Sequence, residues 1–230
     1  MIYLTGTNQL MKKIPDQLPL KINYPLLVLA LVIMIADVWL VFFSGKNELD
    51  TKVFELLSLH ITPGRTNLMR FISFFGSPYF LVPANVFLVV SLYINKNKWL
   101  AICLAFVPLS SVCVMSLLKI LIGRHRPPNP LITPLSNHSF PSGHSFNSIA
   151  FYGTLIWIAS LYIKNKNYKN GLIVFLILFI FSIGFSRIYL RLHYTTDVIA
   201  GWTMGAVWLT ICLLILHRYV PNNTAAKNKE

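Results

Sequence analysis

Charged side chains are scarce in this sequence. Asp, Glu, Lys and Arg make up only 12% of the 230 residues, and Asp and Glu together number 7, whereas hydrophobic residues make up 55%. In soluble globular domains about a quarter of the residues are charged. The scarcity therefore excludes an ordinary soluble domain and predicts a chain that lies in a lipid bilayer.

Cysteine is scarce as well. The cysteines are Cys103, Cys113 and Cys212, and each lies within an apolar run. In such a position a thiol is more often a small buried hydrophobe than a metal ligand or a disulfide partner. The cysteines therefore say little about the redox compartment.

Positive charge is in excess because acidic residues are so few. The formal net charge is +13, and the basic residues stand in short clusters between apolar runs. Such clusters are typical of topology signals or phosphate ligands, not of a nucleic-acid-binding face. We therefore expect no nucleic acid partner, and the sequence gives no indication of the oligomeric state.

Six nearly uncharged runs divide the chain. About 20 residues cross a bilayer as a helix, and each run is long enough to do so. The runs are Tyr24 to Phe43, Phe71 to Ile94, Trp99 to Leu118, Ser145 to Ile163, Gly171 to about Leu192, and Val198 to Leu216. They predict an all-α, polytopic membrane protein with six transmembrane helices and a helical-bundle catalytic core, in a single membrane-embedded domain over residues 1–230.

The two ends of the chain are polar. The first run follows Lys12, Lys13 and Lys21, as in a signal peptide. It is too long for the apolar region of such a peptide and no small-residue cleavage site follows it, so we expect it to remain as a signal anchor. Residues 221–230 are expected to form a disordered tail.

The second run contains residues that interrupt helices near its start. Gly76, Pro78 and Pro83 lie there. We therefore expect the spanning part to begin nearer Tyr79. Residues 46–76 would then be interfacial or re-entrant structure on the same side as the first loop.

Lys and Arg in the short loops indicate the orientation. If the N-terminus is cytoplasmic, the inside segments hold 11 of the 20 basic residues, and five of the other nine lie where phosphate chemistry is expected. We therefore expect both termini inside. Residues 95–98 and 164–170 would be cytoplasmic, and the polar segments that follow the third and fifth runs would face outward.

Those two outward segments are dense in groups that bind or transfer phosphate. They extend from Lys119 to His144 and from Ser186 to Asp197. The fourth and fifth helices run across the bilayer and back, so both segments are expected on one face. Ionisable side chains beside apolar helices suggest a functional site.

The segment Pro141-Ser142-Gly143-His144 immediately precedes the fourth run. Ser142 is a credible N-cap, and the free amides of a helix start attract an anion. The alternative is a plain helix cap beside a structural histidine. The four residues alone do not decide between these interpretations.

His193 and Asp197 stand four residues apart at the start of the sixth run. On a helix this spacing puts the carboxylate beside the imidazole, where it accepts a hydrogen bond from one ring nitrogen and leaves the other as a basic nucleophile. The alternative is a purely structural pair. Several cations that face the same point favour function, because buried like charges repel unless an anion neutralises them.

Taken together, the three segments resemble the signature of the type 2 phosphatidic acid phosphatase family, in a bacterial membrane member. The resemblance covers about residues 99–216, with order and spacing intact. It rests on Lys119, Arg126-Pro127, Pro141-Ser142-Gly143-His144, Ser186-Arg187, His193 and Asp197.

The resemblance implies a role for each matching residue. His193 would attack phosphorus to give a phosphohistidine, Asp197 would orient it, and His144 would protonate the leaving oxygen and then activate water. The phosphoryl oxygens would be held by Lys119, Arg126, Ser142, Gly143 and Arg187. The scheme needs no metal ion and no cofactor.

The substrate implied is a lipid phosphate or diphosphate of the bacterial inner membrane, with the site facing the periplasm or exterior. Undecaprenyl diphosphate and phosphatidylglycerol phosphate are favoured over phosphatidic acid or a lipid A phosphate, by resemblance only. A phosphotransferase could use the same residues. A lipid-phosphate transporter or a silent binding protein would need only the cations, and six apolar runs argue against a soluble vanadium haloperoxidase.

A few polar residues outside the signature have open roles. Asp37, in the first run, is either a structural partner of a neighbouring helix or a group near the substrate channel. Arg124 and His125 either contact a head group or lie in an exposed loop. The other histidines, His60, His138 and His217, are expected to be loop or interface residues.

Overall fold

A computed structural model describes residues 24–43, 48–133 and 136–218, and all its regular structure is helical. Lys12, Lys13, Lys21 and the tail 221–230 lie outside these residues, so the expectations of a signal anchor and of a disordered tail remain predictions. The helices are α1 (Tyr24–Phe42), α2 (Glu48–Ser58), α3 (Pro63–Phe74), α4 (Pro78–Ile94), α5 (Lys98–Ile122), α6 (Gly143–Tyr162), α7 (Lys166–Tyr189) and α8 (Thr195–Arg218).

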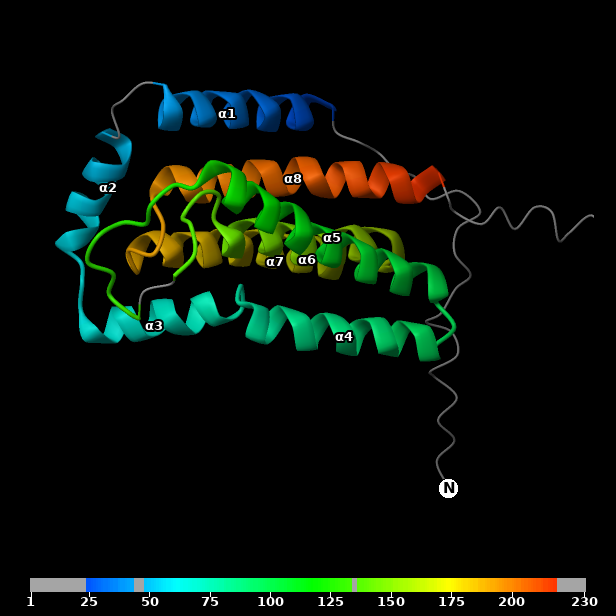
Figure 1. Cartoon of the computed structure of the whole chain (residues 1–230). Helices are drawn as coiled ribbons and strands as arrows, with labels where there is room; N and C mark the ends of the chain where they lie inside the picture. Colours follow the sequence, from blue (N-terminus) through cyan, green and yellow to red (C-terminus); the bar gives the residue numbers. More distant parts are fainter. Residues whose placement is uncertain (1–23, 44–47, 134–135, 219–230) are drawn as a thin grey trace, which may run out of the picture.

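The long helices run side by side, and α2 crosses one end of the bundle (Figure 1). Helix α6 packs against α5, α7 and α8, and α1 covers the opposite side of α8. Helices α3 and α4 follow one another along the lower edge of the view. The loops from α5 to α6 and from α7 to α8 lie at the same end as α2.

The six predicted runs coincide with α1 and α4 to α8, the second run also covering the end of α3, but the prediction of six membrane spans is not confirmed. Four stretches are long and apolar enough to cross a membrane, namely Pro63–Ile94, Lys98–Ile122, Lys166–Tyr189 and Thr195–Arg218, and Leu27–Phe42 is a shorter apolar helix. Helix α6 is not among these stretches, and its Ser145, Ser148 and Thr154 are buried. A helix enclosed by other helices needs less apolar surface than one that faces lipid.

The break predicted in the second run is present. Helix α3 ends at Phe74, and α4 begins at Pro78, where a proline is favoured because it has no amide hydrogen to satisfy. Residues before the break form α2 and α3, and Thr62 caps α3 by accepting from the Arg65 amide at 3.3 Å. The start of α4 lies next to the expected Tyr79, but the apolar stretch long enough to span extends from Pro63 to Ile94, so the interfacial or re-entrant placement of residues 46–76 stays a prediction.

Two glycines bring α8 close to α6. A β-carbon on Gly201 would lie 2.7 Å from the carbonyl oxygen of Ser142, and one on Gly205 would lie 3.0 Å from that of Phe146. Any larger residue at Gly201 would push the helices apart. This contact fixes the start of α6 beside the start of α8.

Candidate active site

The two polar segments of the signature meet at one end of the bundle, as expected if the two helices between them cross the bilayer and return. The amide of Leu131 donates to the carbonyl of Leu190 at 3.1 Å, and the amide of Ser142 donates to the backbone carbonyl of Asp197 at 2.8 Å. Residues far apart in sequence are thus joined by main-chain hydrogen bonds. The site rests on backbone contacts as well as on side chains.

His193 lies in the turn before α8, not on the helix as expected. Helix α8 begins at Thr195, and Asp197 is its third residue. The carboxylate Oδ2 of Asp197 accepts from the Tyr194 amide at 2.9 Å, as in a capping box, and lies 3.4 Å from His193 Nδ1. The histidine and the aspartate are therefore paired, through a helix cap and not through one helical turn.

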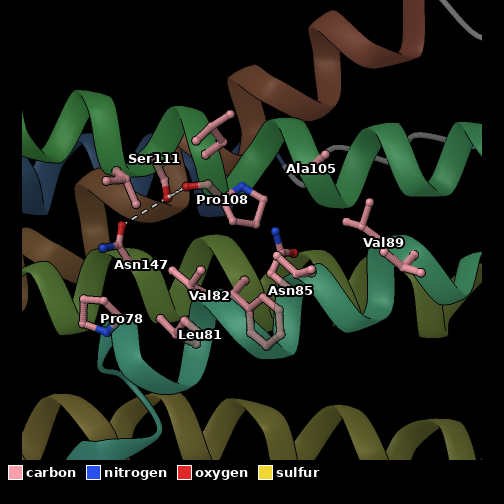
Figure 2. Close-up of a pocket in the computed structure, with 14 residues that line it drawn as sticks. Pro78, Leu81, Val82, Asn85, Val89, Ala105, Pro108, Ser111 and Asn147 are labelled. Atoms are coloured by element: carbon pink, nitrogen blue, oxygen red, sulfur yellow. Dashed lines mark hydrogen bonds between the residues drawn. The ribbon is translucent and has the colours of Figure 1, made fainter. Parts of the chain in front are cut away.

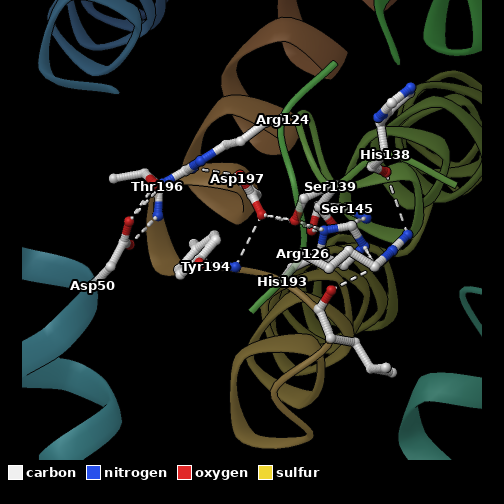
Figure 3. A network of polar contacts seen from close by, with 12 residues as sticks. Asp50, Arg124, Arg126, His138, Ser139, Ser145, His193, Tyr194, Thr196 and Asp197 are labelled. Atoms are coloured by element: carbon white, nitrogen blue, oxygen red, sulfur yellow. Dashed lines mark hydrogen bonds and ion pairs between the residues drawn. The ribbon is translucent and has the colours of Figure 1, made fainter. Parts of the chain in front are cut away.

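The contacts of His193 define its tautomer. Arg126 Nη1 lies 3.2 Å from His193 Nε2, and a guanidinium can only donate. Nε2 must therefore keep its lone pair, and the ring hydrogen lies on Nδ1, toward Asp197. Ser139 adds a second contact to Nδ1 at 3.4 Å and also donates to Asp197 Oδ2 (Figure 3).

The surroundings of His193 favour its neutral form. Burial lowers its pKa to about 3, the hydrogen bond and the charge of Asp197 oppose that shift, and the cations Arg187 and Arg126 add to it. A neutral imidazole with an unprotonated Nε2 is the form that can attack an electrophile. Burial lowers the pKa of Arg126 too.

Loop carbonyls hold Lys119 and Arg126. Both side chains donate to the carbonyl of His138, and Arg126 also donates to the carbonyl of Asn137 at 2.8 Å and to its side-chain oxygen at 2.6 Å. A further bond runs from Arg126 to the carbonyl of Leu192. These bonds restrict the directions in which the two cations point.

Arg187 is almost completely buried in α7, with 3% of its surface exposed. Its Nη1 donates to Ser73 of α3 at 2.6 Å. Its Nε and Nη2 have no hydrogen-bond partner within the described part of the chain. Such a guanidinium presents two parallel N–H groups, the geometry that binds two oxygens of one phosphate.

The start of α6 forms another wall of the site. Ser142 is its N-cap, as predicted, and accepts from the Ser145 amide at 3.5 Å. Gly143 and His144 follow at the first two positions of the helix. The His144 ring lies against the α3 to α4 break, because a β-carbon on Gly76 would be 3.2 Å from its Cδ2.

A cavity of about 800 Å³ joins these groups. Its lining includes six of the eight predicted site residues, namely Lys119, Arg126, Gly143, His144, Arg187 and His193. Asp197 and Ser142 are fully buried behind that lining, where they hold His193 and the start of α6. Six of the predicted residues therefore line one cavity, and the other two lie directly behind them.

An apolar groove of about 330 Å³ lies between α4 and α5 (Figure 2). Leu81, Val82, Val89 and other apolar residues line it. Pro78 and Asn147 line both the groove and the cavity, so the two hollows adjoin. A molecule with a charged head and an apolar tail could occupy both.

Several residues that surround the site were missed by the sequence analysis. Ser73, Ser139 and Asp50 lie in segments without a motif, and only the fold brings them to the site. Arg124, for which a head-group contact and an exposed loop were both open, is instead paired with two carboxylates at 2.6 and 3.0 Å. No sequence signal could have identified these partners.

Asp37 and His125, whose roles the sequence left open, can be placed in the structure. Asp37 is buried in α1, and its Oδ2 has no hydrogen-bond partner among the residues described. His125 is exposed. Within residues 24–43, 48–133 and 136–218, no group of three or more His, Cys, Asp or Glu side chains is arranged to hold a metal ion.

Comparison with known proteins gives a consistent match. Residues 100–221 match the sequence model of the PAP2 superfamily. Phosphatidylglycerophosphatase B of Bacillus subtilis (strain 168) is 29% identical over 164 residues, which cover 70% of this chain and 80% of that protein. An undecaprenyl-diphosphatase of Sulfolobus acidocaldarius is 23% identical over 191 residues, which cover 80% of this chain and 86% of that protein.

The fold also matches a solved structure. The transmembrane PAP2 type phosphatidylglycerolphosphate phosphatase from Bacillus subtilis superposes with a TM-score of 0.74 at 22% identity. The match covers 86% of this chain and 96% of that one. At this identity the likeness shows a shared fold.

Proposed function

Because the chain belongs to the PAP2 superfamily of membrane phosphatases, we propose that it hydrolyses a phosphate monoester or diphosphate of a membrane lipid through a phosphohistidine on His193. One observation carries the proposal. His193, whose Nε2 carries no hydrogen, lines the same cavity as Lys119, Arg126 and Arg187, and its Nδ1 is held by Asp197.

The first step is transfer of the phosphoryl group to the protein. Nε2 of His193 attacks phosphorus, and the bond from phosphorus to the lipid oxygen breaks. His144 gives a proton to that oxygen as it leaves. Asp197 stabilises the positive charge that develops on the His193 ring, and the three cations stabilise the phosphoryl oxygens.

The second step hydrolyses the phosphohistidine and regenerates free His193. Water attacks the phosphohistidine, His144 takes a proton from the water, and the bond from phosphorus to nitrogen breaks. Free phosphate leaves with the oxygen of water. The same group thus acts as acid in the first step and as base in the second.

The charge compensation in this scheme comes from side chains and amides. Lys119, Arg126 and Arg187 converge on the cavity, and the start of α6 presents free amides to it. Asp197, the motif carboxylate, is committed to His193 and Arg124. The reaction is therefore proposed to proceed without a metal ion.

The apolar groove supports a lipid substrate. It adjoins the cavity at Pro78 and Asn147, so an acyl or prenyl tail in the groove would put the head group at His193. Relatives act on phosphatidylglycerophosphate and undecaprenyl diphosphate by name. We propose one of these two lipids as substrate, in a bacterial inner membrane with the site outside and the whole chain acting as one domain.

The test is phosphate release by the purified protein in detergent. Phosphatidylglycerol phosphate, undecaprenyl diphosphate, phosphatidic acid and a lipid A phosphate are assayed with and without excess EDTA. We expect turnover of at least one lipid, unchanged by EDTA and lost in His193→Ala. Loss of activity in EDTA with recovery on added divalent ions would contradict the metal-free scheme.

A further arm separates hydrolysis from phosphoryl transfer to another lipid. Reaction products are analysed for free phosphate and for newly phosphorylated lipid in the same sample. Hydrolysis yields one phosphate for each lipid consumed. A newly phosphorylated lipid in place of free phosphate would identify a phosphotransferase.

A further inference from the structure

Helix α2 brings a buried carboxylate to the back of the active site. Asp50 is 1% exposed. Its Oδ1 accepts from the Thr196 amide at 3.0 Å, and its Oδ2 accepts from the Thr196 hydroxyl at 2.8 Å. A carboxylate from one helix therefore caps the start of another, next to Asp197.

Arg124 bridges this carboxylate and the one that holds the histidine. Its Nη2 lies 3.0 Å from Asp50 Oδ2, and its Nη1 lies 2.6 Å from Asp197 Oδ1. Nη1 also donates to the Thr196 hydroxyl at 2.8 Å, and the guanidinium carbon lies 4.3 Å from the centre of the Tyr194 ring. Figure 3 shows Arg124 between the two carboxylates.

The charges of Asp50, Arg124 and Asp197 affect how well the His193 ring can carry positive charge. Without Asp50, Arg124 would neutralise Asp197, and that pair would carry no net charge. With Asp50 present, two carboxylates share one guanidinium, and the group of three carries a formal charge of −1. The ring of His193 becomes positive as Nε2 attacks phosphorus, so this charge stabilises the product of the first step.

We propose that Asp50 and Arg124 are positioning residues for the reaction. Arg124 fixes Asp197 through Oδ1, so that Oδ2 stays with His193. Asp50 offsets the charge of Arg124. The inference rests on the proposed function, since it assumes that His193 is the nucleophile, and it adds α2 to the parts of the chain on which catalysis depends.

The test compares Asp50→Asn with Glu55→Gln, which removes a carboxylate from an exposed position of the same helix. Steady-state kinetics and the rate of phosphoenzyme formation in a single turnover are measured for each. In Asp50→Asn we expect kcat and the phosphorylation rate to fall about tenfold, with KM changed less than about threefold. Glu55→Gln should match the wild type.

The double variant Asp50→Asn with Arg124→Gln distinguishes an electrostatic effect on His193 from a purely structural role of the contact. It removes one charge of each sign and restores the formal charge beside His193, so its kcat should exceed that of Asp50→Asn by about threefold or more. Loss of the contact from Arg124 to Asp197 should keep that kcat below the wild-type value. A purely structural contact would make the double variant no better than the single one. That result, or an Asp50→Asn kcat within about twofold of Glu55→Gln, would overturn the inference.

Thermal unfolding in detergent verifies that each variant is folded. If Asp50→Asn does not fold, Arg124→Gln is measured alone, and a kcat within about twofold of Glu55→Gln then overturns the inference. Failure of the proposed function has a different signature. In that case the wild-type protein itself would release no phosphate, or His193→Ala would still trap labelled phosphate.

Discussion

A buried histidine can act as a nucleophile only if one ring nitrogen keeps its lone pair. Here Arg126 faces Nε2 and Asp197 faces Nδ1, so the contacts on either side of the ring choose the same tautomer. Each contact favours that tautomer, and the two reinforce one another. At the scale of single residues, His193 therefore depends on its contacts with Arg126 and Asp197, and a change in either partner should affect it.

The variants His144→Ala and His193→Ala should lose phosphatase activity at different steps. His144→Ala should still form the phosphoenzyme from an aryl phosphate, because a good leaving group needs little protonation, but the water step should then stall. His193→Ala should form none. Labelling with a radioactive aryl phosphate, quenched in alkaline detergent because phosphohistidine is acid-labile, distinguishes the two, and label trapped on His193→Ala protein would show that another residue is the nucleophile.

The pH dependence of His193 follows from its burial. Its folded pKa is lowered to about 3, so the ring stays neutral as the pH falls to about 4. The unfolded chain binds the extra proton first, at about pH 6.5, so this histidine makes the fold less stable as the pH falls from 6.5 toward 3. The charged groups that influence it are Asp197, Arg187 and Arg126.

Nitrogen NMR of protein labelled in histidine measures this directly. The His193 signals are assigned by their loss in His193→Ala, and free histidine in the sample serves as the reference. At pH 5 the reference should be protonated, and His193 should show one protonated and one bare ring nitrogen. A His193 signal that titrates together with the reference would contradict the prediction.

At the scale of whole elements, the ends of the helices matter more than their middles. The start of α8 orients Asp197 through the Tyr194 amide, the start of α6 presents Gly143 and His144, and the break between α3 and α4 supports the His144 ring. Each helix end contributes a different part of the site. Changes at these ends should therefore affect turnover as well as stability.

Gly76 is the position where this can be tested with one methyl group. A β-carbon there would lie 2.4 Å from Ile183 Cγ2 and 3.2 Å from both His144 Cδ2 and Ser148 Oγ. Gly76→Ala should reduce stability by about 1–3 kcal/mol through overpacking. It should also lower kcat, because His144 must shift.

Thermal unfolding and phosphate release are measured with two comparison variants. Gly64→Ala lies in α3, where nothing stands within 4 Å of the new methyl group, and should leave kcat unchanged. Adding Ile183→Ala to Gly76→Ala removes the closest contact and should restore part of the activity. An unchanged kcat in Gly76→Ala would show that the position of His144 does not depend on this contact.

Sequence alone predicts the elements well and their contacts poorly. The apolar runs predict six of the helices, and Ser142 is identified as a cap because its residue type and position are typical of one. The turn conformation of His193 was missed because the helix start at Thr195 depends on a contact with Asp197. Asp50 and Ser73 could not be predicted, since each meets its partner through the packing of distant helices.

At the scale of the whole molecule, the two ends of the helical bundle differ. The loops that carry His193 and Arg126 lie at one end, and the short turns from α4 to α5 and from α6 to α7 lie at the other (Figure 1). The lysines at the second end are typical of a cytoplasmic face. This division supports an orientation with the site outside.

Cysteine labelling of intact cells tests the orientation. In a background without Cys103, Cys113 and Cys212, Ser136→Cys should react with an impermeant reagent, and Asn167→Cys should react only after the cells are lysed. Both positions are exposed, so access and not burial decides the result. Reaction of Asn167→Cys in intact cells would reverse the orientation.

The junction of the cavity and the apolar groove at Pro78 and Asn147 bears on what substrate concentration means for this protein. A lipid would diffuse in the plane of the bilayer until its tail entered the groove, and its head group would then reach His193 without passing through water. Turnover would then follow the mole fraction of substrate among its neighbouring lipids, whatever the volume of water around the membrane. Diluting the membrane with inert lipid would slow the reaction, whereas diluting the suspension with buffer would not.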